Sequence, residues 1–445
     1  MNISLSKIKG KINSSDIASR MASGAIWTFT GTAIAKLIVL IAGILCARIL
    51  GKELYGEFGM VRSTINMFVV LGTAGLGMTA TKYISEYRKE HKDKVASIYI
   101  LTNRFALITG LIVSALVIMF ADKIAITALN SPQLVVPFKF GAILLLVTIL
   151  LATQNGVLYG LEDFKSVAIN TFIGSIFETI FMLLGAYYYG VMGAVIGFGC
   201  GFVSQLVVNK VSIRRSMKEQ DIDISKGKLK VQEIKLLYKF SLPAMLSSML
   251  IAPTFWLIRT MLVNESGYGE LAIYEAADQW KIILLAVPAM FAQILLPILS
   301  SVVNVDKNKY WILLKINLVL NVLITFCVSI IVMCFSKKIM LSYGEEFSNE
   351  TTLNLIVLST IFTSLANVVG TAIASRSKMW IGFCFNLLWS LLVLLLTYYF
   401  LRMGMNSVGV GMAILISYLV HSILQLIYLY YLRKKEYKII QKNYA

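Results

Sequence analysis

The sequence predicts an all-α membrane protein of twelve transmembrane helices, arranged as two six-helix lobes related by a parallel pseudo-twofold repeat. Composition, recurrent apolar segments and matches between the two halves predict it. The 445 residues are 58% hydrophobic and 14% charged, with a mean hydropathy of +0.77, whereas soluble globular proteins carry about 25% charged residues. This composition excludes a soluble enzyme, a secreted disulfide scaffold and a disordered chain.

The apolar segments are long enough to cross a bilayer, which takes about 20 helical residues. Helices are expected because spanning backbone must satisfy its own hydrogen bonds, and no segment alternates as barrel strands do. The expected spans are residues 23–46, 57–79, 97–119, 136–158, 167–188, 191–211, 239–263, 271–299, 311–335, 352–373, 381–401 and 407–431. They divide the chain into a lead-in (1–20), a first lobe (21–212), a charged linker (213–236), a second lobe (237–432) and a basic tail (433–445).

Basic residues orient these spans. With the N-terminus inside, 27 of the 41 Lys and Arg residues fall in inner segments and 7 in outer segments. Because inner loops of membrane proteins are enriched in Lys and Arg, both termini are expected to be cytoplasmic. The same bias explains most of the formal charge of +18 without a nucleic-acid partner.

Short matches between the halves predict an internal repeat. Tyr55-Gly-Glu57 recurs as Tyr268-Gly-Glu270, an offset of 213, and Gly190-Val-Met-Gly193 matches Asn406-Ser-Val-Gly409, an offset of 216. The near-constant offset and the equal span counts indicate duplication. Since each half has an even number of spans, the halves share one orientation and enclose a central cavity.

Four cations within the expected spans are candidate binding residues. A charge at the bilayer centre costs at least about 2.5–3.5 kcal/mol on insertion scales, so it normally faces a wet interior. Lys36 and Arg62, in spans one and two, have no acidic partner nearby on their own helices, and both are expected to line the lumen. Arg259 in span seven and Lys281 in span eight complete the set.

Three acidic residues within spans are candidates for coupling to H⁺ or Na⁺: Glu178, Glu275 and Asp278. Glu178 either neutralises one of the cations across the bundle or carries a coupling proton. Asp278 lies three residues before Lys281, so the two either form a structural ion pair or belong to a pathway. Catalytic motifs and metal-ligand spacings are missing from the sequence, so we expect no enzyme activity, metal or cofactor.

Loose motifs spread over the whole chain carry a family resemblance. They are Ala47-Arg-Ile-Leu-Gly-Lys-Glu-Leu-Tyr-Gly-Glu-Phe-Gly59, Gly75-Leu-Gly77, Lys82-Tyr-Ile-Ser-Glu86, Asn155-Gly-Val-Leu-Tyr-Gly-Leu161, Phe240-Ser-Leu-Pro243 and Tyr274-Glu-Ala-Ala-Asp-Gln279. In order and spacing they resemble the Wzx-type O-antigen and polysaccharide flippases of the multidrug/oligosaccharidyl-lipid/polysaccharide (MOP) superfamily. The resemblance implies a MATE-like, V-shaped pair of lobes that works by alternating access in the bacterial cytoplasmic membrane.

The resemblance also implies a cargo. Such proteins move undecaprenyl-diphosphate-linked oligosaccharide from the inner to the outer leaflet for O-antigen or capsule synthesis. Their cavity is lined mainly by spans one, two, seven and eight, which here carry the four cations. Fixed cations would offset the desolvation of the diphosphate. Expected partners are membrane lipids, a polysaccharide polymerase and glycosyltransferases.

Prolines predict a moving helix. Pro243 and Pro253 lie in span seven, where each removes a backbone hydrogen bond and favours a kink. We therefore expect this helix to bend during transport, with these two residues as the hinge.

Two other functions stay open. An ion-coupled multidrug exporter of the same superfamily needs an acidic lumen for cationic substrates, and several such relatives carry an acidic residue in helix one, where this chain has Lys36. A non-transporting scaffold for polysaccharide assembly predicts that neutralising Lys36 and Arg62 is harmless.

Overall fold

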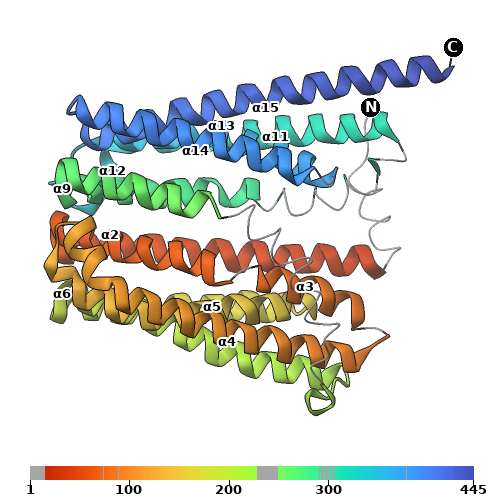
Figure 1. Ribbon diagram of the computed structural model, residues 1–445, viewed down its shortest axis with the longest axis horizontal. Helices are drawn as coiled ribbons and strands as arrows, with labels where there is room; N and C mark the ends of the chain where they lie inside the picture. Colours follow the sequence, from red (N-terminus) through yellow and green to blue (C-terminus); the bar gives the residue numbers. More distant parts are fainter. Residues whose placement is uncertain are drawn as a thin grey trace.

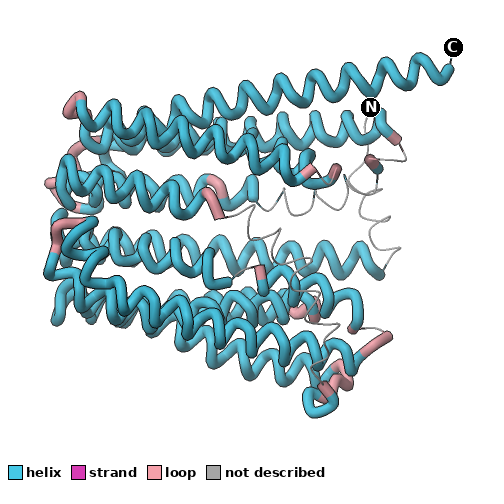
Figure 2. The backbone as a smooth tube through the Cα atoms, viewed as in Figure 1, coloured by secondary structure: helices cyan, strands magenta, loops and turns pink. Residues whose placement is uncertain are grey.

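The computed structural model describes residues 16–73, 75–88, 90–227, 249–289, 291, 295, 299, 302–303, 306–376 and 378–444. In these residues the regular structure is helical, without strands (Figure 2). The long helices are α2 (Asp16–Thr73), α3 (Leu76–Tyr87), α4 (Lys92–Asp122), α5 (Val135–Gly160), α6 (Phe164–Glu219), α9 (Ile251–Leu284), α11 (Lys307–Cys334), α12 (Ser336–Tyr343), α13 (Glu350–Ser375), α14 (Met379–Arg402) and α15 (Asn406–Tyr444). Short helical turns cover Lys123–Ala128, Pro132–Leu134 and Ile224–Lys226.

The helices form two groups that lie side by side (Figure 1). Helices α2 to α6 pack on one another and make the first group, and α9 to α15 make the second. Helices α2 and α9 pack against each other and form the main contact between the groups. The largest interface between the two halves of the chain is therefore built on these two helices.

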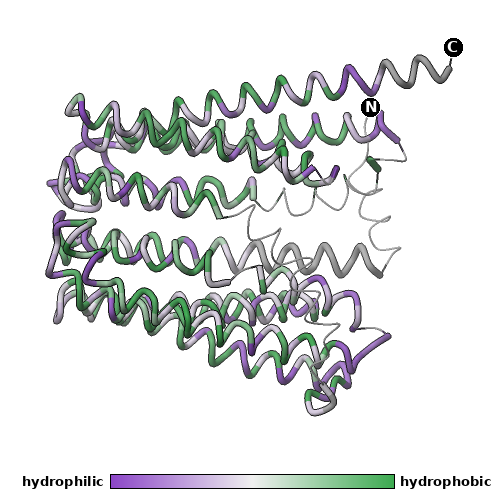
Figure 3. The backbone as a smooth tube through the Cα atoms, in the orientation of Figure 1, coloured by the Kyte–Doolittle hydropathy of each residue, from purple (hydrophilic) through white to green (hydrophobic). Residues whose placement is uncertain are grey.

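Eight of the described helical segments are long and apolar enough to cross a membrane. Two of them, Thr30–Thr73 and Phe164–Glu219, have 44 and 56 residues, about twice the length that one crossing needs. Hydrophobic residues recur along the described helices (Figure 3). Many of their side chains are exposed, and Val211 and Leu395, for example, are 63% and 67% exposed. So large an exposed apolar surface is stable in lipid rather than in water.

Glycines with positive φ break three of the long helices, α2, α6 and α9. Gly51 in α2 has φ 76°, Gly190 in α6 has φ 58° and Gly267 in α9 has φ 81°. Each lies between two of the expected spans. Gly51 and Gly267 are 216 residues apart, as are Gly190 and Asn406, which has φ 48°. The chain therefore turns at matching positions in its two halves.

The expected segment boundaries differ in part from the helices. Helix α6 continues to Glu219, so the first residues of the expected linker are helical, and 228–236 lie outside the described residues, as do 1–15 of the lead-in. The basic tail prolongs α15, where the Arg376 guanidinium donates to Glu436 Oε1 at 2.5 Å.

Neither of the expected hinge prolines lies in the interior of a described helix. Pro253 occupies the first turn of α9, which begins at Ile251, and proline is tolerated there because the first N–H groups have no partner within the helix. The break in α9 falls instead at Gly267. Pro243 lies outside the described residues, and bending of this helix stays a prediction.

Replacing Gly267 with Ala should destabilise the protein. At Gly267 φ is 81° and ψ is 176°, a region that is essentially restricted to glycine, so a Cβ should cost about 1–3 kcal/mol. The matched control is Gly370→Ala, because a Cβ at either position meets no atom within 4 Å and only the backbone conformation differs. Thermal unfolding of the purified protein should show a lower Tm for Gly267→Ala alone. Equal Tm values would contradict a strained turn.

Candidate functional site

A buried cluster of charged residues joins the two groups of helices. Arg62 comes from α2, and Arg259, Glu275, Asp278 and Lys281 come from α9. The four α9 residues are buried. Because α9 breaks at Gly267, its two arms run back along each other, and Arg259 on one arm reaches the carboxylates on the other.

Glu275 lies between two guanidinium groups. Arg62 donates from Nη2 to Glu275 Oε2 at 2.9 Å, and Arg259 donates from Nε to Glu275 Oε1 at 2.5 Å. The carboxylate is 2% exposed. Gly59 on α2 makes room for it, since a Cβ there would come within 2.6 Å of Glu275 Cγ. One buried carboxylate thus ties α2 to both arms of α9.

Asp278 holds the other side of the cluster. Its Oδ2 accepts a hydrogen bond from Arg259 Nη2 at 2.9 Å, and its Oδ1 pairs with Lys281. The ion pair that the i, i+3 spacing allows is thus present, whereas a role of the pair in a pathway stays a prediction. Lys281 Nζ also lies 4.2 Å from the centre of the Phe255 ring, a cation–π contact that supports the charge in a dry site.

The cluster has unequal numbers of positive and negative groups. It contains three cations and two carboxylates, so one positive charge remains when all are ionised. In a low-dielectric interior such an excess attracts anions more strongly than it would in water. The site therefore favours an anionic ligand, although its arginines already have carboxylate partners.

Arg62 differs from the sequence expectation. The sequence predicts a lumen-facing cation whose only candidate partner across the bundle is Glu178, but the carboxylate that binds Arg62 is Glu275, from the other half of the chain. Examining one helix at a time cannot reveal such a partner, because the two residues are 213 positions apart. The same separation of 213 residues relates the two Tyr-Gly-Glu motifs, so Arg62 and Glu275 occupy equivalent positions in the repeat. This equivalence is the feature of the sequence that could have indicated the pair.

Lys36 and Glu178 stay outside this cluster. Lys36 on α2 is half-buried and makes no hydrogen bond or ion pair with any other residue that the structure describes. Glu178 on α6 is half-buried too and packs where Gly201 leaves space. Within the described part of the chain, Glu178 forms no ion pair with Lys36 or Arg62, so direct neutralisation of either cation is absent there.

Sequence reasoning missed a second polar contact between the groups. Gln279 donates from Nε2 to the Tyr55 hydroxyl at 2.6 Å and accepts at Oε1 from the Tyr343 hydroxyl at 3.0 Å. All three side chains are buried. Tyr55 and Gln279 stand within the motifs that carry the family resemblance, so the motif positions were the signal that could have found them.

Contacts between the groups gather at the end of the molecule where α2 and α9 break. Besides the buried cluster, Arg48 donates to the Ser342 carbonyl at 2.6 Å, Lys52 lies 3.8 Å from Glu270, and Asn264 donates to the Ala128 carbonyl at 3.0 Å. These residues lie close in sequence to Gly51 and Gly267 or at neighbouring helix ends. The two groups are thus held together at this end.

Comparison with known families places the chain. Residues 21–303, more than half of it, match the family described as polysaccharide biosynthesis protein. The chain belongs to this family. The resemblance to polysaccharide flippases is thereby confirmed. A similar protein is the EPS I polysaccharide export inner membrane protein EpsE of Ralstonia nicotianae, which is 22% identical over 394 residues, 85% of this chain and 87% of that protein.

Solved structures show the fold of this polysaccharide biosynthesis family member. An inward-facing multidrug resistance MATE family transporter of the MOP superfamily aligns with a TM-score of 0.78, at 14% identity over 92% of this chain and 99% of its own. An outward-facing MATE family transporter aligns with a TM-score of 0.70, at 16% identity over 92% and 94%. The MATE-like fold expected from the sequence is therefore confirmed.

Removing the charge of Glu275 should loosen the junction between the groups. Glu275→Gln leaves Arg62 and Arg259 without their shared carboxylate, and breaking a buried ion pair typically costs about 3–5 kcal/mol. Thermal unfolding of the purified protein measures the effect as a lower Tm. The control is Glu265→Gln on the same helix, whose 3.5 Å pair with Arg402 is exposed and should contribute about 0–1 kcal/mol. The same Tm for both variants would contradict the role of Glu275.

Proposed function

We propose that this membrane protein translocates undecaprenyl-diphosphate-linked oligosaccharide from the inner to the outer leaflet of the bacterial inner membrane, for O-antigen or capsule synthesis. The observation that carries the proposal is the net positive charge buried at the α2–α9 junction. Family membership and the naming of EpsE as a polysaccharide export inner membrane protein support a transporter rather than an enzyme. Polymerase and glycosyltransferase partners belong to the same proposal.

The proposed architecture has twelve spans in two lobes related by a parallel repeat. Support comes from the residues with positive φ that recur at an offset of 216 and from the two helical segments of double length. The excess of basic residues in the expected inner segments supports cytoplasmic termini. With this orientation, the joined end near Gly51 and Gly267 faces outward, as the proposed inward-facing state requires. The higher TM-score against the inward-facing transporter, 0.78 rather than 0.70, agrees.

Exchange of anions gives the site a mechanism. A diphosphate cannot enter hydrocarbon unaided, and the planar guanidinium fork binds phosphate oxygens with two parallel hydrogen bonds. Glu275 now occupies the donors of Arg62 and Arg259. An arriving diphosphate competes with Glu275 for the guanidinium groups of Arg62 and Arg259. When the diphosphate displaces the carboxylate, the ion pair between Arg62 on α2 and Glu275 on α9 is broken. Headgroup binding is thereby coupled to opening at the outer end, while the lipid tail stays in the bilayer.

Neutralising the lumen cations should abolish surface polysaccharide. Arg62→Ala removes one phosphate ligand, and Lys36→Ala removes a cation that has no ion pair among the described residues. In complementation of a flippase-null strain, each variant should insert normally and give no surface polysaccharide. The control is Lys315→Ala, because this span residue of α11 is exposed on the outside of the bundle. Wild-type polysaccharide from both lumen variants would support the scaffold function instead.

Glu178 is the proposed coupling residue for H⁺ or Na⁺. Its half-buried carboxylate has no hydrogen bond or ion pair within the described chain, so both oxygens are available to a cation. Transport into proteoliposomes should depend on an H⁺ or Na⁺ gradient in the wild type and lose that dependence in Glu178→Gln. Glu162→Gln, at the short turn between α5 and α6, is the control. Unchanged ion dependence in Glu178→Gln excludes this residue and leaves Glu275 and Asp278 as the candidates.

A further inference from the structure

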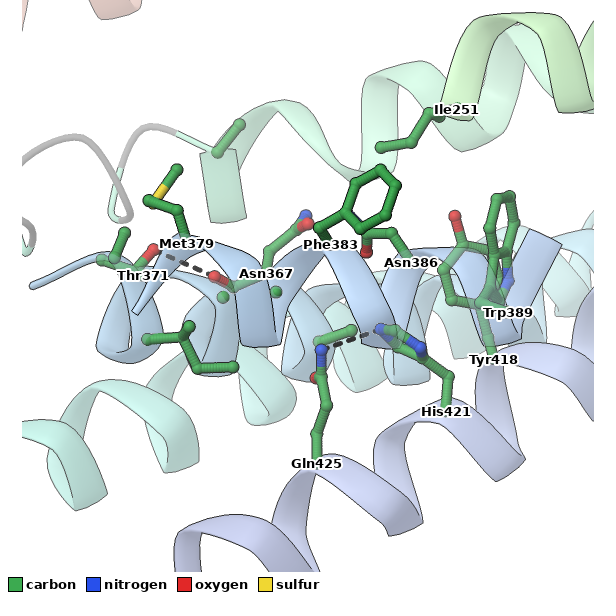
Figure 4. A pocket seen from close by; sticks show the side chains of 16 residues that line it. Ile251, Asn367, Thr371, Met379, Phe383, Asn386, Trp389, Tyr418, His421 and Gln425 are labelled. Carbon is green, nitrogen blue, oxygen red and sulfur yellow. Dashed lines mark hydrogen bonds between the residues drawn. The ribbon is translucent and has the colours of Figure 1, made fainter. Parts of the chain in front are cut away.

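A cavity lies within the second group of helices, and none of its lining residues belongs to the charged cluster. It encloses about 490 Å³ between the start of α9 and helices α13, α14 and α15 (Figure 4). Binding pockets for small molecules typically measure about 300–1,000 Å³. The volume of this cavity therefore lies within the range of small-molecule binding sites.

The lining of this cavity is uncharged and mostly apolar, with a few polar groups. None of the sixteen described residues that line it is Asp, Glu, Lys or Arg. Its polar groups are the amides of Asn367, Asn386 and Gln425, the hydroxyl of Thr371 and the imidazole of His421. An amide side chain offers both hydrogen-bond donors and an acceptor. The cavity is thus equipped for a ligand whose groups both donate and accept.

Aromatic rings form the rest of the contact surface. Phe383, Trp389 and Tyr418 line the cavity, with Asn386 between the first two on α14 (Figure 4). The Trp389 and Tyr418 ring centres lie 5.0 Å apart, so the two rings pack against each other. Flat apolar faces beside amides are suited to a ligand with both C–H surfaces and hydroxyl groups.

Two polar atoms at this cavity lack partners. Gln425 and His421 are hydrogen-bonded to each other at 2.8 Å, but Gln425 Oε1 and Trp389 Nε1 are buried without a hydrogen bond to any described residue. Both side chains are 3% exposed. Buried polar atoms nearly always have a partner. Neither atom is reached from the cavity in this structure, so the polar contacts that a ligand could make come from Asn367, Thr371 and Asn386, which are not fully buried.

We propose that this cavity binds an uncharged sugar of the lipid-linked oligosaccharide. The inference rests on the proposed function and names a separate subsite for the part of the cargo that carries no charge. A diphosphate requires cations, which the α2–α9 junction has and this lining lacks. Sugar hydroxyls match the amides, and the C–H faces of a sugar ring match the aromatic side chains.

Gly370 on α13 allows a sharp test. It lines the cavity, and a Cβ there would meet no atom within 4 Å. Gly370→Phe places a ring in the open space, whereas Gly370→Ala adds one methyl group and leaves most of the volume free. Asn386→Ala, which removes an amide without adding bulk, serves as a second variant should Gly370→Phe fail to fold.

The experiment measures ligand binding to four proteins in lipid nanodiscs: the wild type, Gly370→Phe, Gly370→Ala and Asn386→Ala. Maltoside detergents are avoided because their sugar headgroups could themselves occupy a sugar site. The probes are undecaprenyl diphosphate, the same lipid carrying the host's repeat unit, the released oligosaccharide, and tetraphenylphosphonium as a drug-like cation. Gly370→Phe and Asn386→Ala should bind the sugar-linked lipid at least ten-fold more weakly than the wild type and Gly370→Ala. All four proteins should bind undecaprenyl diphosphate equally.

If Gly370→Phe and Asn386→Ala bound the sugar-linked lipid as tightly as the wild type does, the sugar subsite would be overturned. It would also be overturned if these variants lost only their binding of tetraphenylphosphonium. Failure of the proposed function has a different signature, in which the wild type binds neither lipid. In that event, oligosaccharide binding that Gly370→Phe abolishes supports a sugar site on its own, and absence of oligosaccharide binding overturns it.

Discussion

The arrangement of the two helix groups depends on one buried carboxylate. Glu275 accepts hydrogen bonds from Arg62 of the first group and Arg259 of the second, so the same side chain fixes α2 against both arms of α9. The contact needs two local features of the backbone. Gly267 turns the chain back so that Arg259 and Glu275 meet, and Gly59 lets the carboxylate approach α2 closely.

A charged junction of this kind is unusual as a purely structural device. Burying two carboxylates and three cations carries a large desolvation cost, and well-packed apolar side chains often hold helices together equally well. Ion pairs differ from apolar contacts because an incoming ion can take the place of one of the two charged partners. A junction made of them can be strong with one ligand state and weak with another, as a transporter with alternating access requires.

The charged cluster and the uncharged cavity differ in chemistry. The diphosphate and the sugar of the proposed lipid-linked cargo differ in the same way. Charged groups gather where α2 meets α9, and neutral amides and aromatic rings gather between α13, α14 and α15. Each lining suits a ligand that the other would bind poorly, since a buried charge requires a counter-charge and a neutral hydroxyl requires a hydrogen-bond partner. Selectivity for a composite cargo would follow from separating the two.

The sequence by itself determined the helical membrane class, the MATE-like fold and the family, because hydropathy and motif order can be read directly from the chain. Its i, i+3 spacing allowed the Asp278–Lys281 pair without deciding it. It also placed the Tyr-Gly-Glu motifs beside the breaks at Gly51 and Gly267. Only the tertiary structure decided that Arg62 is paired while Lys36 has no partner among the described residues. It alone brought residues of α13, α14 and α15 around one cavity. The reason is that pairing and enclosure depend on which helix faces meet, and that is set by packing between residues far apart in the chain.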